Sequence, residues 1–344
     1  MSENKNLTLK AKDPRSLWSK FMSLNGASVF VAMIAVIIIF EIYLQITRGG
    51  GGLLFATPAN LMSILRKQVY VGIIAFGLTL VMITGNIDLS VGSMYTMMCC
   101  VVATIMMKTD NVVLGVVGAV GLGAVCGLFN GVLVSYLKLN SFITTLGSSS
   151  IFTAIALMIS AGTILVIPND CSPAFRWLGT ASFGPVHILI VWFVVVAVVL
   201  GLILSRTVLG KRIYVIGANP TAARFSGIKD KKLTTIAYVI TGACVGLAAM
   251  IVMANTLSSN PQTGSGEEMD IILAVVLGGV AVNGGKGSVW GTIIGIMFTG
   301  VLASGFTQMN FSIYQQWVIM GIIMVFALSL DAMKGKGVKL WRRK

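Results

Sequence analysis

Long apolar segments separated by short polar ones dominate the hydrophobic pattern of this chain. Many of these segments approach or exceed the ~20 apolar residues that a helix needs to cross a bilayer. Ten such segments are predicted as membrane-spanning helices, with boundaries uncertain by a few residues. Their ranges are 28–47, 68–85, 90–107, 112–137, 141–166, 187–205, 233–256, 270–283, 288–307 and 314–333. The pattern predicts an all-α polytopic membrane protein, since a lipid-spanning barrel would show ~10-residue alternating segments.

The composition excludes an ordinary soluble protein. Hydrophobic residues make up 56% of the 344 residues and charged residues 10%, against about 25% charged residues in soluble domains. The mean hydropathy is +0.92. The net charge of +14 would suggest a nucleic-acid partner in a soluble chain. Here most cations cluster in a few polar segments, which is typical of the cytoplasmic loops of membrane proteins, so no nucleic-acid partner is expected.

The positions of the cations predict which segments face the cytoplasm. They concentrate in a basic N-terminal tail (1–27), in the segment 206–232 and in a basic C-terminal tail (334–344). With ten spans these three segments lie on one side of the membrane, and the positive-inside rule makes that side cytoplasmic. The expected organisation is therefore a transmembrane permease domain over 28–333, with both tails and the 206–232 loop in the cytoplasm.

Two apolar stretches are interrupted by glycine, asparagine and serine. One reads "LTLVMITGNIDLSVGSMYTMM" (78–98) and the other "ILAVVLGGVAVNGGKGSVWGTIIG" (272–295). Irregular backbone at membrane depth is tolerated only where protein or a water-filled cavity surrounds it, and paired interruptions point to a transport site. The alternative is that both are tight cytoplasmic turns between neighbouring helices. The polar candidates for lining a path or a helix break are Thr84, Asn86, Asp88, Ser90, Thr144, Thr145 and Asn283.

Asp88 is a rare ionisable residue within these stretches, and two roles are open to it. Its carboxylate could accept backbone N–H groups as the N-cap of a half-helix over 89–98. It could instead contact a polar solute directly, because ionisable residues inside membranes are often functional. The cap is the favoured interpretation.

Enzyme signatures are absent from the sequence, and a non-catalytic role is expected. The segment around Lys286 fails the G-x-x-x-x-G-K-[ST] pattern, because Val280 stands where the first glycine is needed and Gly287 where Ser or Thr is needed. Proton relays need carboxylates or histidines inside the spans, and these are scarce. An energy source on another chain therefore fits better than the alternatives, which are a secondary transporter with broken helices and a non-transport membrane protein.

The basic loop contains the pattern of a short capped helix. In "GANPTAARFSGI" (217–228), Asn219 is a plausible N-cap, Pro220 suits the first helical position and Gly227 suits the stop. Ala222, Ala223 and Phe225 are expected to form one apolar patch beside Arg224. Such a helix would suit docking in a groove of a partner, although an ordinary loop helix explains the pattern equally well.

Four motifs together give the chain a family resemblance. They are "ITGNIDLSVGS" (83–93), "NSFITTLGS" (140–148), "LGKRIYVIGANPTAARFSGI" (209–228) and "AVVLGGVAVNGGKGSVWGTIIG" (274–295). With them the chain resembles the permease subunits of bacterial ABC importers for monosaccharides, the ribose, xylose and galactose group that includes an autoinducer-2 importer. The likeness runs from about Pro58 to Leu330. Family members usually carry glycine where this chain has Asn86 and Ala218, and the solute could differ accordingly.

The resemblance implies a set of partners and a location in the bacterial inner membrane. It implies a second permease subunit (identical or paralogous), an extracytoplasmic sugar-binding protein and a cytoplasmic ABC ATPase. ATP and magnesium would then be bound by the ATPase, and this chain would hold no cofactor. The segment matching the family's coupling helix would contact the ATPase through Asn219, Pro220, Thr221, Ala222, Ala223, Arg224, Phe225 and Gly227.

Overall fold

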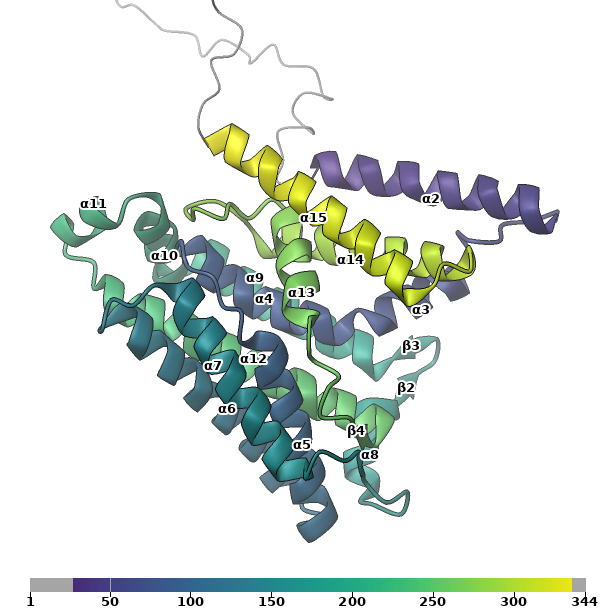
Figure 1. The fold of residues 1–344 in the computed structure, drawn as a ribbon, viewed down its shortest axis with the longest axis horizontal. Coiled ribbons are helices and arrows are strands. Elements are labelled where there is room, and N and C mark those ends of the chain that lie inside the picture. Colours follow the sequence, from purple (N-terminus) through teal and green to yellow (C-terminus); the bar gives the residue numbers. More distant parts are fainter. Residues whose placement is uncertain (1–26, 50, 336–344) are drawn as a thin grey trace, which may run out of the picture.

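The computed structural model describes residues 27–49 and 51–335, so the predicted basic tails lie almost wholly outside the described residues. Within them the regular elements are helices and two small sheets (Figure 1). The helices of the first half are α2 (Ala27–Arg48), α3 (Pro58–Lys67), α4 (Val69–Ile83), α5 (Val91–Thr109), α6 (Val112–Ser135), α7 (Ser141–Ser160) and α8 (Pro173–Thr180). Those of the second half are α9 (Ile188–Arg206), α10 (Val208–Ala218), α11 (Pro220–Phe225), α12 (Asp230–Thr256), α13 (Glu267–Leu277), α14 (Val289–Gln308) and α15 (Ile313–Gly335).

The two sheets are short antiparallel pairs at the ends of helices. β1 (Leu165–Val166) pairs with β4 (Ser258–Ser259), and β2 (Ser182–Phe183) pairs with β3 (Val186–His187). Figure 1 shows α8 and the strands at the end of the molecule opposite α10 and α11. The elements between α7 and α9 and the strand β4 after α12 therefore gather at one end, and the basic loop lies at the other.

Each predicted apolar segment overlaps a helix, but not every one of these helices is long enough to span a membrane. Among the described residues, seven helices have the length and apolar composition to cross: α2, α5, α6, α7, α9, α12 and α14. An eighth span results if α3 and α4, which meet at a bend of 54°, are taken together. α15 carries a shorter apolar stretch over Ile313–Ser329. The structure therefore confirms an all-helical membrane protein and supports seven or eight spans by length and composition.

Two predicted boundaries are wrong. The segment 141–166 ends as a helix at Ser160, because Ala161 and Gly162 adopt positive φ and the chain then enters β1. The segment 270–283 is helical only over α13. Eleven residues rise about 16 Å, roughly half of the ~30 Å hydrocarbon core. α13 is therefore a half-length helix, and a glycine-rich loop over 278–288 takes the place of its expected second half.

The stretch 78–98 is also divided between two helices. α4 ends at Ile83, and the segment 84–90 leads to α5, which begins at Val91 and not at 89 as predicted. Tyr95 in the second turn of α5 stacks on Tyr70 in the first turn of α4, with ring centroids 5.3 Å apart. Since Tyr70 lies at the far end of α4, the segment 84–90 must return along α4 before α5 starts. The interruption is therefore a partly buried segment between two helices, and we call residues 84–90 the return segment.

The main core joins α4, α5, α6 and α12. α6 and α12 pack at very short range, because Gly123 and Gly127 of α6 face Gly242 and the Tyr238 backbone of α12. A Cβ at Gly123 or Gly127 would overlap the partner's backbone carbonyl. A second, smaller core joins α2, α3 and α14 around Phe40, which contacts Phe55 and Phe306. The basic loop and the return segment are attached to the main core.

Candidate functional site

Three segments that are far apart in the sequence meet in one junction. They are the end of α4 with Gly85, the end of α10 at Gly217 and Ala218, and the loop 283–285. The Gly285 backbone N–H donates to the Ile83 carbonyl over 2.9 Å. A Cβ added to Gly217 would overlap the same Ile83 oxygen and press on the Gly285 nitrogen. We call this contact the glycine junction, and its members are Ile83, Gly85, Gly217, Ala218 and residues 283–285.

Glycine is required at the junction by both conformation and space. Gly85, Gly284 and Gly285 have φ angles of +83°, +82° and +75°, a region that other residues rarely adopt. A Cβ at Gly284 would lie 2.6 Å from the Gly85 nitrogen, and one at Gly285 would lie 2.8 Å from the Ala218 Cα. The glycine-rich composition of both interruptions therefore allows their backbones to touch.

A further contact ties α10 to the loop 278–288. The Tyr214 hydroxyl donates to the Gly287 carbonyl over 2.7 Å. α10 was not predicted, although Leu209, Ile213 and Ile216 follow helical spacing and Thr207 caps the helix by accepting from Gly210 N. That spacing and cap are the sequence signals that could have revealed it.

The predicted capped helix is present as α11. The Asn219 side chain accepts from Ala222 N over 2.9 Å, and Pro220 occupies the first helical position. The helix ends at Phe225, and Gly227 follows with a φ of +73°. Thr221 and Ala222 are exposed. The local sequence therefore specified this helix correctly.

The expected single apolar patch on α11 is wrong. Ala223 is fully buried in a small cluster with Ile216 and Leu233, whereas Phe225 is 90% exposed. Successive helical positions lie about 100° apart, so two residues that are two positions apart point to nearly opposite sides. Ala223 therefore attaches α11 to α10 and α12, and Phe225 is the apolar side chain that α11 presents outward.

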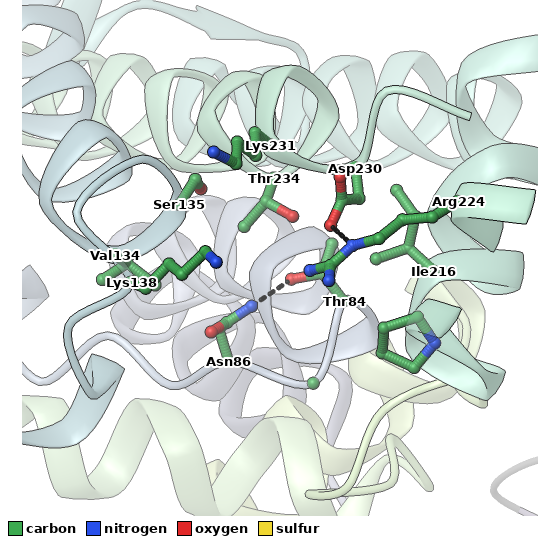
Figure 2. Close-up of a pocket in the computed structure, with 12 residues that line it drawn as sticks. Thr84, Asn86, Val134, Ser135, Lys138, Ile216, Arg224, Asp230, Lys231 and Thr234 are labelled. Carbon is green, nitrogen blue, oxygen red and sulfur yellow. Dashed lines mark hydrogen bonds and ion pairs between the residues drawn. The ribbon is translucent and has the colours of Figure 1, made fainter. Parts of the chain in front are cut away.

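A pocket of about 360 Å³ lies beside α11 and includes members of both predicted residue groups. Thr84 and Asn86 reach it from the return segment, and Pro220 and Arg224 reach it from α11 (Figure 2). Asn86 donates to the Thr84 hydroxyl over 3.0 Å. Arg224 Nε pairs with Asp230 Oδ2 at 2.7 Å. The pocket therefore joins the return segment to the short helix of the basic loop.

The other polar candidates take different positions. Asp88, Ser90 and Thr145 are buried, Thr144 is half-buried, and Asn283 is exposed at the glycine junction. The Thr145 hydroxyl accepts from Leu89 N over 3.0 Å and so holds the return segment against α7. These residues do not share one surface within the single chain.

Asp88 belongs to a buried polar network. Its Oδ1 accepts from Ser90 N over 2.9 Å and from the Ser90 hydroxyl over 2.6 Å. Asn130 Nδ2 in turn donates to the Ser90 hydroxyl over 2.8 Å. Asp88 Oδ2 and Asn130 Oδ1 are buried and accept no hydrogen bond from a described residue. The prediction that Asp88 is the N-cap of this helix is therefore wrong, because Ser90 occupies the N-cap position of α5. Asp88 instead orders the turn before the helix by accepting from both Ser90 donors.

Two side chains that bind the segment 84–90 were missed from the sequence. Asn130 is a lone amide in the apolar helix α6, and that isolation was the available signal. Tyr238 of α12 donates its hydroxyl to the Ile87 carbonyl over 3.2 Å. Nothing local to Tyr238 indicates this contact, since its partner lies 151 positions away. α6, α7 and α12 together therefore fix the return segment.

Comparison with known proteins identifies the family of the chain. The profile described as branched-chain amino acid transport system / permease component matches residues 60–328. The ribose import permease protein RbsC of Bacillus subtilis is 34% identical over 280 residues, covering 81% of this chain and 87% of that protein. The L-arabinose ABC transporter permease protein AraH of Azospirillum brasilense is 31% identical over 277 residues, covering 80% and 81%. The D-allose transport system permease protein AlsC of Escherichia coli is 31% identical over 284 residues, covering 82% and 86%. No solved structure matches the chain.

The profile match covers most of the chain, and the alignments span more than four fifths of each relative. The long apolar helices agree with a location in the inner membrane. The chain therefore belongs to the family of permease components of bacterial ABC importers and is a multi-pass protein of the plasma membrane.

Proposed function

We propose that this chain is the membrane-spanning subunit of an ATP-driven importer and forms the path for a sugar or a similar small polar solute. The names of the relatives support this proposal, since they import ribose, L-arabinose and D-allose. An extracytoplasmic binding protein would deliver the solute. The importer would contain a second permease subunit, either a copy of this chain or a close paralogue. Membrane lipid would surround the remaining apolar faces.

We further propose that α11 receives the movement of a cytoplasmic ATPase. The observation that carries this proposal is the glycine junction, where the helix leading into α11 touches both interrupted segments. Interfaces in which backbones pack this closely switch between discrete arrangements and do not deform smoothly. A displacement of α11 would therefore move the return segment and the loop 278–288 together. ATP and magnesium would be bound on the ATPase, and this chain would have no catalytic role.

The proposed orientation has ten spans and both termini in the cytoplasm. The distribution of cations supports it, with α13 and the segment before it counted as one crossing. The basic segment 206–232 then faces the cytoplasm, and α8 with the β2–β3 hairpin faces outward. The permease domain would extend over 28–333.

Single cysteines at Asn111, Lys138, Ser182 and Thr221 test this orientation. All four positions are exposed and lie in successive connections around α6, α7 and α9. We expect a membrane-impermeant maleimide to label the cysteines at 111 and 182 from outside intact cells, and those at 138 and 221 only after the membrane is opened. The unsubstituted chain measures the background from its five native cysteines. Labelling of 182 and 221 from the same side would refute the orientation.

Neighbouring glutamate substitutions on α11 test the coupling role. Ala222 is exposed, so we expect Ala222→Glu to leave the melting temperature unchanged while uptake and ATPase binding fall strongly. Ala223 is fully buried, so the matched Ala223→Glu should fail to fold, because burying an unpaired carboxylate costs several kcal/mol. Phe225→Ala removes the exposed ring and should resemble Ala222→Glu. The measurements are sugar uptake in cells, co-purification of the ATPase and thermal unfolding in detergent. Normal uptake by both Ala222→Glu and Phe225→Ala would remove α11 from the coupling role.

A further inference from the structure

The pocket beside α11 carries an excess of positive charge. Three cationic side chains line it, Lys138, Arg224 and Lys231, together with the carboxylate of Asp230. Asp230 is already paired with Arg224. Neither Lys138 nor Lys231 forms an ion pair with any residue that the structure describes, and Lys231 Nζ lies 5.6 Å from the centre of the Tyr136 ring. The pocket therefore offers two ammonium groups without a carboxylate partner.

Neutral hydrogen-bond donors accompany these cations. Ser135 Oγ lines the pocket and is buried, yet it has no hydrogen-bond partner among the described residues. Thr234 contributes a second hydroxyl, and Asn86 contributes an amide with one N–H directed to Thr84. A buried hydroxyl without a partner is costly. A ligand with several acceptor oxygens would satisfy Ser135 as well as the two lysines.

Lys138 faces Arg224 across the pocket. Lys138 has a φ of +57°, which is uncommon for a residue other than glycine. In Figure 2 its side chain points into the pocket from the side opposite Arg224, with Asn86 between the two. A guanidinium group and an ammonium group that face each other across a hydroxyl-lined hollow suit a phosphate group, since arginine matches its oxygens in a planar fork.

We propose that this pocket binds a phosphate group, carried either by a small solute or by the headgroup of an anionic lipid. The pocket volume of about 360 Å³ leaves room for the remainder of a small molecule. A bound phosphate would connect Arg224 of α11 to Lys138 and Lys231, and so hold α11 against the end of α6 and the start of α12. Only the assignment of the pocket to the cytoplasmic face rests on the proposed function.

Binding is tested on the purified full-length chain, without transport. The chain is reconstituted in nanodiscs of phosphatidylcholine and titrated with inorganic phosphate at constant ionic strength, with chloride as the reference anion. We expect phosphate to raise the melting temperature, and Lys138→Gln and Lys231→Gln each to weaken the apparent affinity roughly tenfold, the loss of one charge-assisted hydrogen bond. Lys232→Gln is the matched control, because Lys232 is exposed and adjacent to Lys231 but does not line the pocket.

A second arm identifies the source of the phosphate. The same variants are placed in nanodiscs that contain phosphatidylglycerol. If the lipid headgroup occupies the pocket, the anionic discs should stabilise the unsubstituted chain and Lys232→Gln more than Lys138→Gln, and added phosphate should have little further effect.

Either pattern supports the phosphate site. Equal effects of phosphate and chloride, together with no dependence on Lys138 or Lys231 in either lipid, would overturn it. Normal uptake by both Ala222→Glu and Phe225→Ala, with an intact phosphate response, would refute the proposed coupling role of α11 alone.

Discussion

Gly217→Ala should abolish import and lower the melting temperature of the chain. The added methyl group would overlap the Ile83 carbonyl oxygen and press on the Gly285 nitrogen, and both are backbone atoms. It would also break the 2.9 Å hydrogen bond that these two groups make with each other. Overpacking of this kind typically costs about 1–3 kcal/mol. The backbone cannot move away at low cost, because α10, α4 and the loop 283–285 are each attached to other helices.

The matched control for this substitution is Gly201→Ala. Gly201 is also a buried helical glycine, but the nearest atoms to its added Cβ lie 3.9 Å away on Trp290 and Val289. The substitution should be neutral or slightly stabilising, since alanine is favoured over glycine in a helix by roughly 0.5–1 kcal/mol. The measurements are thermal unfolding in detergent and solute uptake in cells. A Gly217→Ala variant that behaves like Gly201→Ala would show that the junction is not tightly packed.

The sequence predicts well the features that depend on local chemistry. Runs of apolar residues identified each long helix, because crossing a bilayer demands a minimum length of apolar chain. Asn219 and Pro220 marked the start of α11. The same local pattern begins α3, where Thr57 accepts from Asn60 N over 3.2 Å and Pro58 is the first helical residue. These signals act over three or four residues, so they do not depend on the rest of the fold.

Features that depend on distant contacts could not be predicted in the same way. The half-length of α13 follows from the loop 278–288, which is held by the hydrogen bonds from Gly285 N to the Ile83 carbonyl over 2.9 Å and from the Tyr214 hydroxyl to the Gly287 carbonyl over 2.7 Å. An apolar run in the sequence does not reveal that its last residues leave the helix to contact two other helices. The glycine junction joins residues that lie 67 to 202 positions apart. Its glycines were visible in the sequence, but their partners were not.

The burial of Ala223 shows the same limit on a smaller scale. The residues of α11 were correctly assigned to a helix, yet the face that it buries is set by α10, an element absent from the prediction. Ile216 of α10 and Leu233 of α12 form the cluster that receives Ala223. Once α10 is known, the division between Ala223 inside and Phe225 outside follows from helix geometry.

Asp88→Ala should destabilise the chain by roughly 2–4 kcal/mol, whereas Asp88→Asn should change stability by less than about 1 kcal/mol. The alanine variant removes the acceptor of Ser90 N and of the Ser90 hydroxyl, and each buried group left without a partner costs about 1–3 kcal/mol. Asparagine keeps one side-chain oxygen in the place of Oδ1. It also replaces the second oxygen, which accepts nothing from a described residue, and removes a buried negative charge that no described cation neutralises.

Thermal unfolding and solute uptake of both variants separate the two roles of Asp88. If the carboxylate only orders the turn before α5, uptake should follow stability, so that the asparagine variant imports nearly as well as the unsubstituted chain. If the negative charge meets the solute or a cation of another subunit, the asparagine variant should lose uptake while its melting temperature stays normal. We expect the first result, because Asp88 is fully buried between α5 and α6 and lines no described pocket. An alanine variant of normal stability and uptake would contradict both roles, since the Ser90 groups would then be satisfied without Asp88.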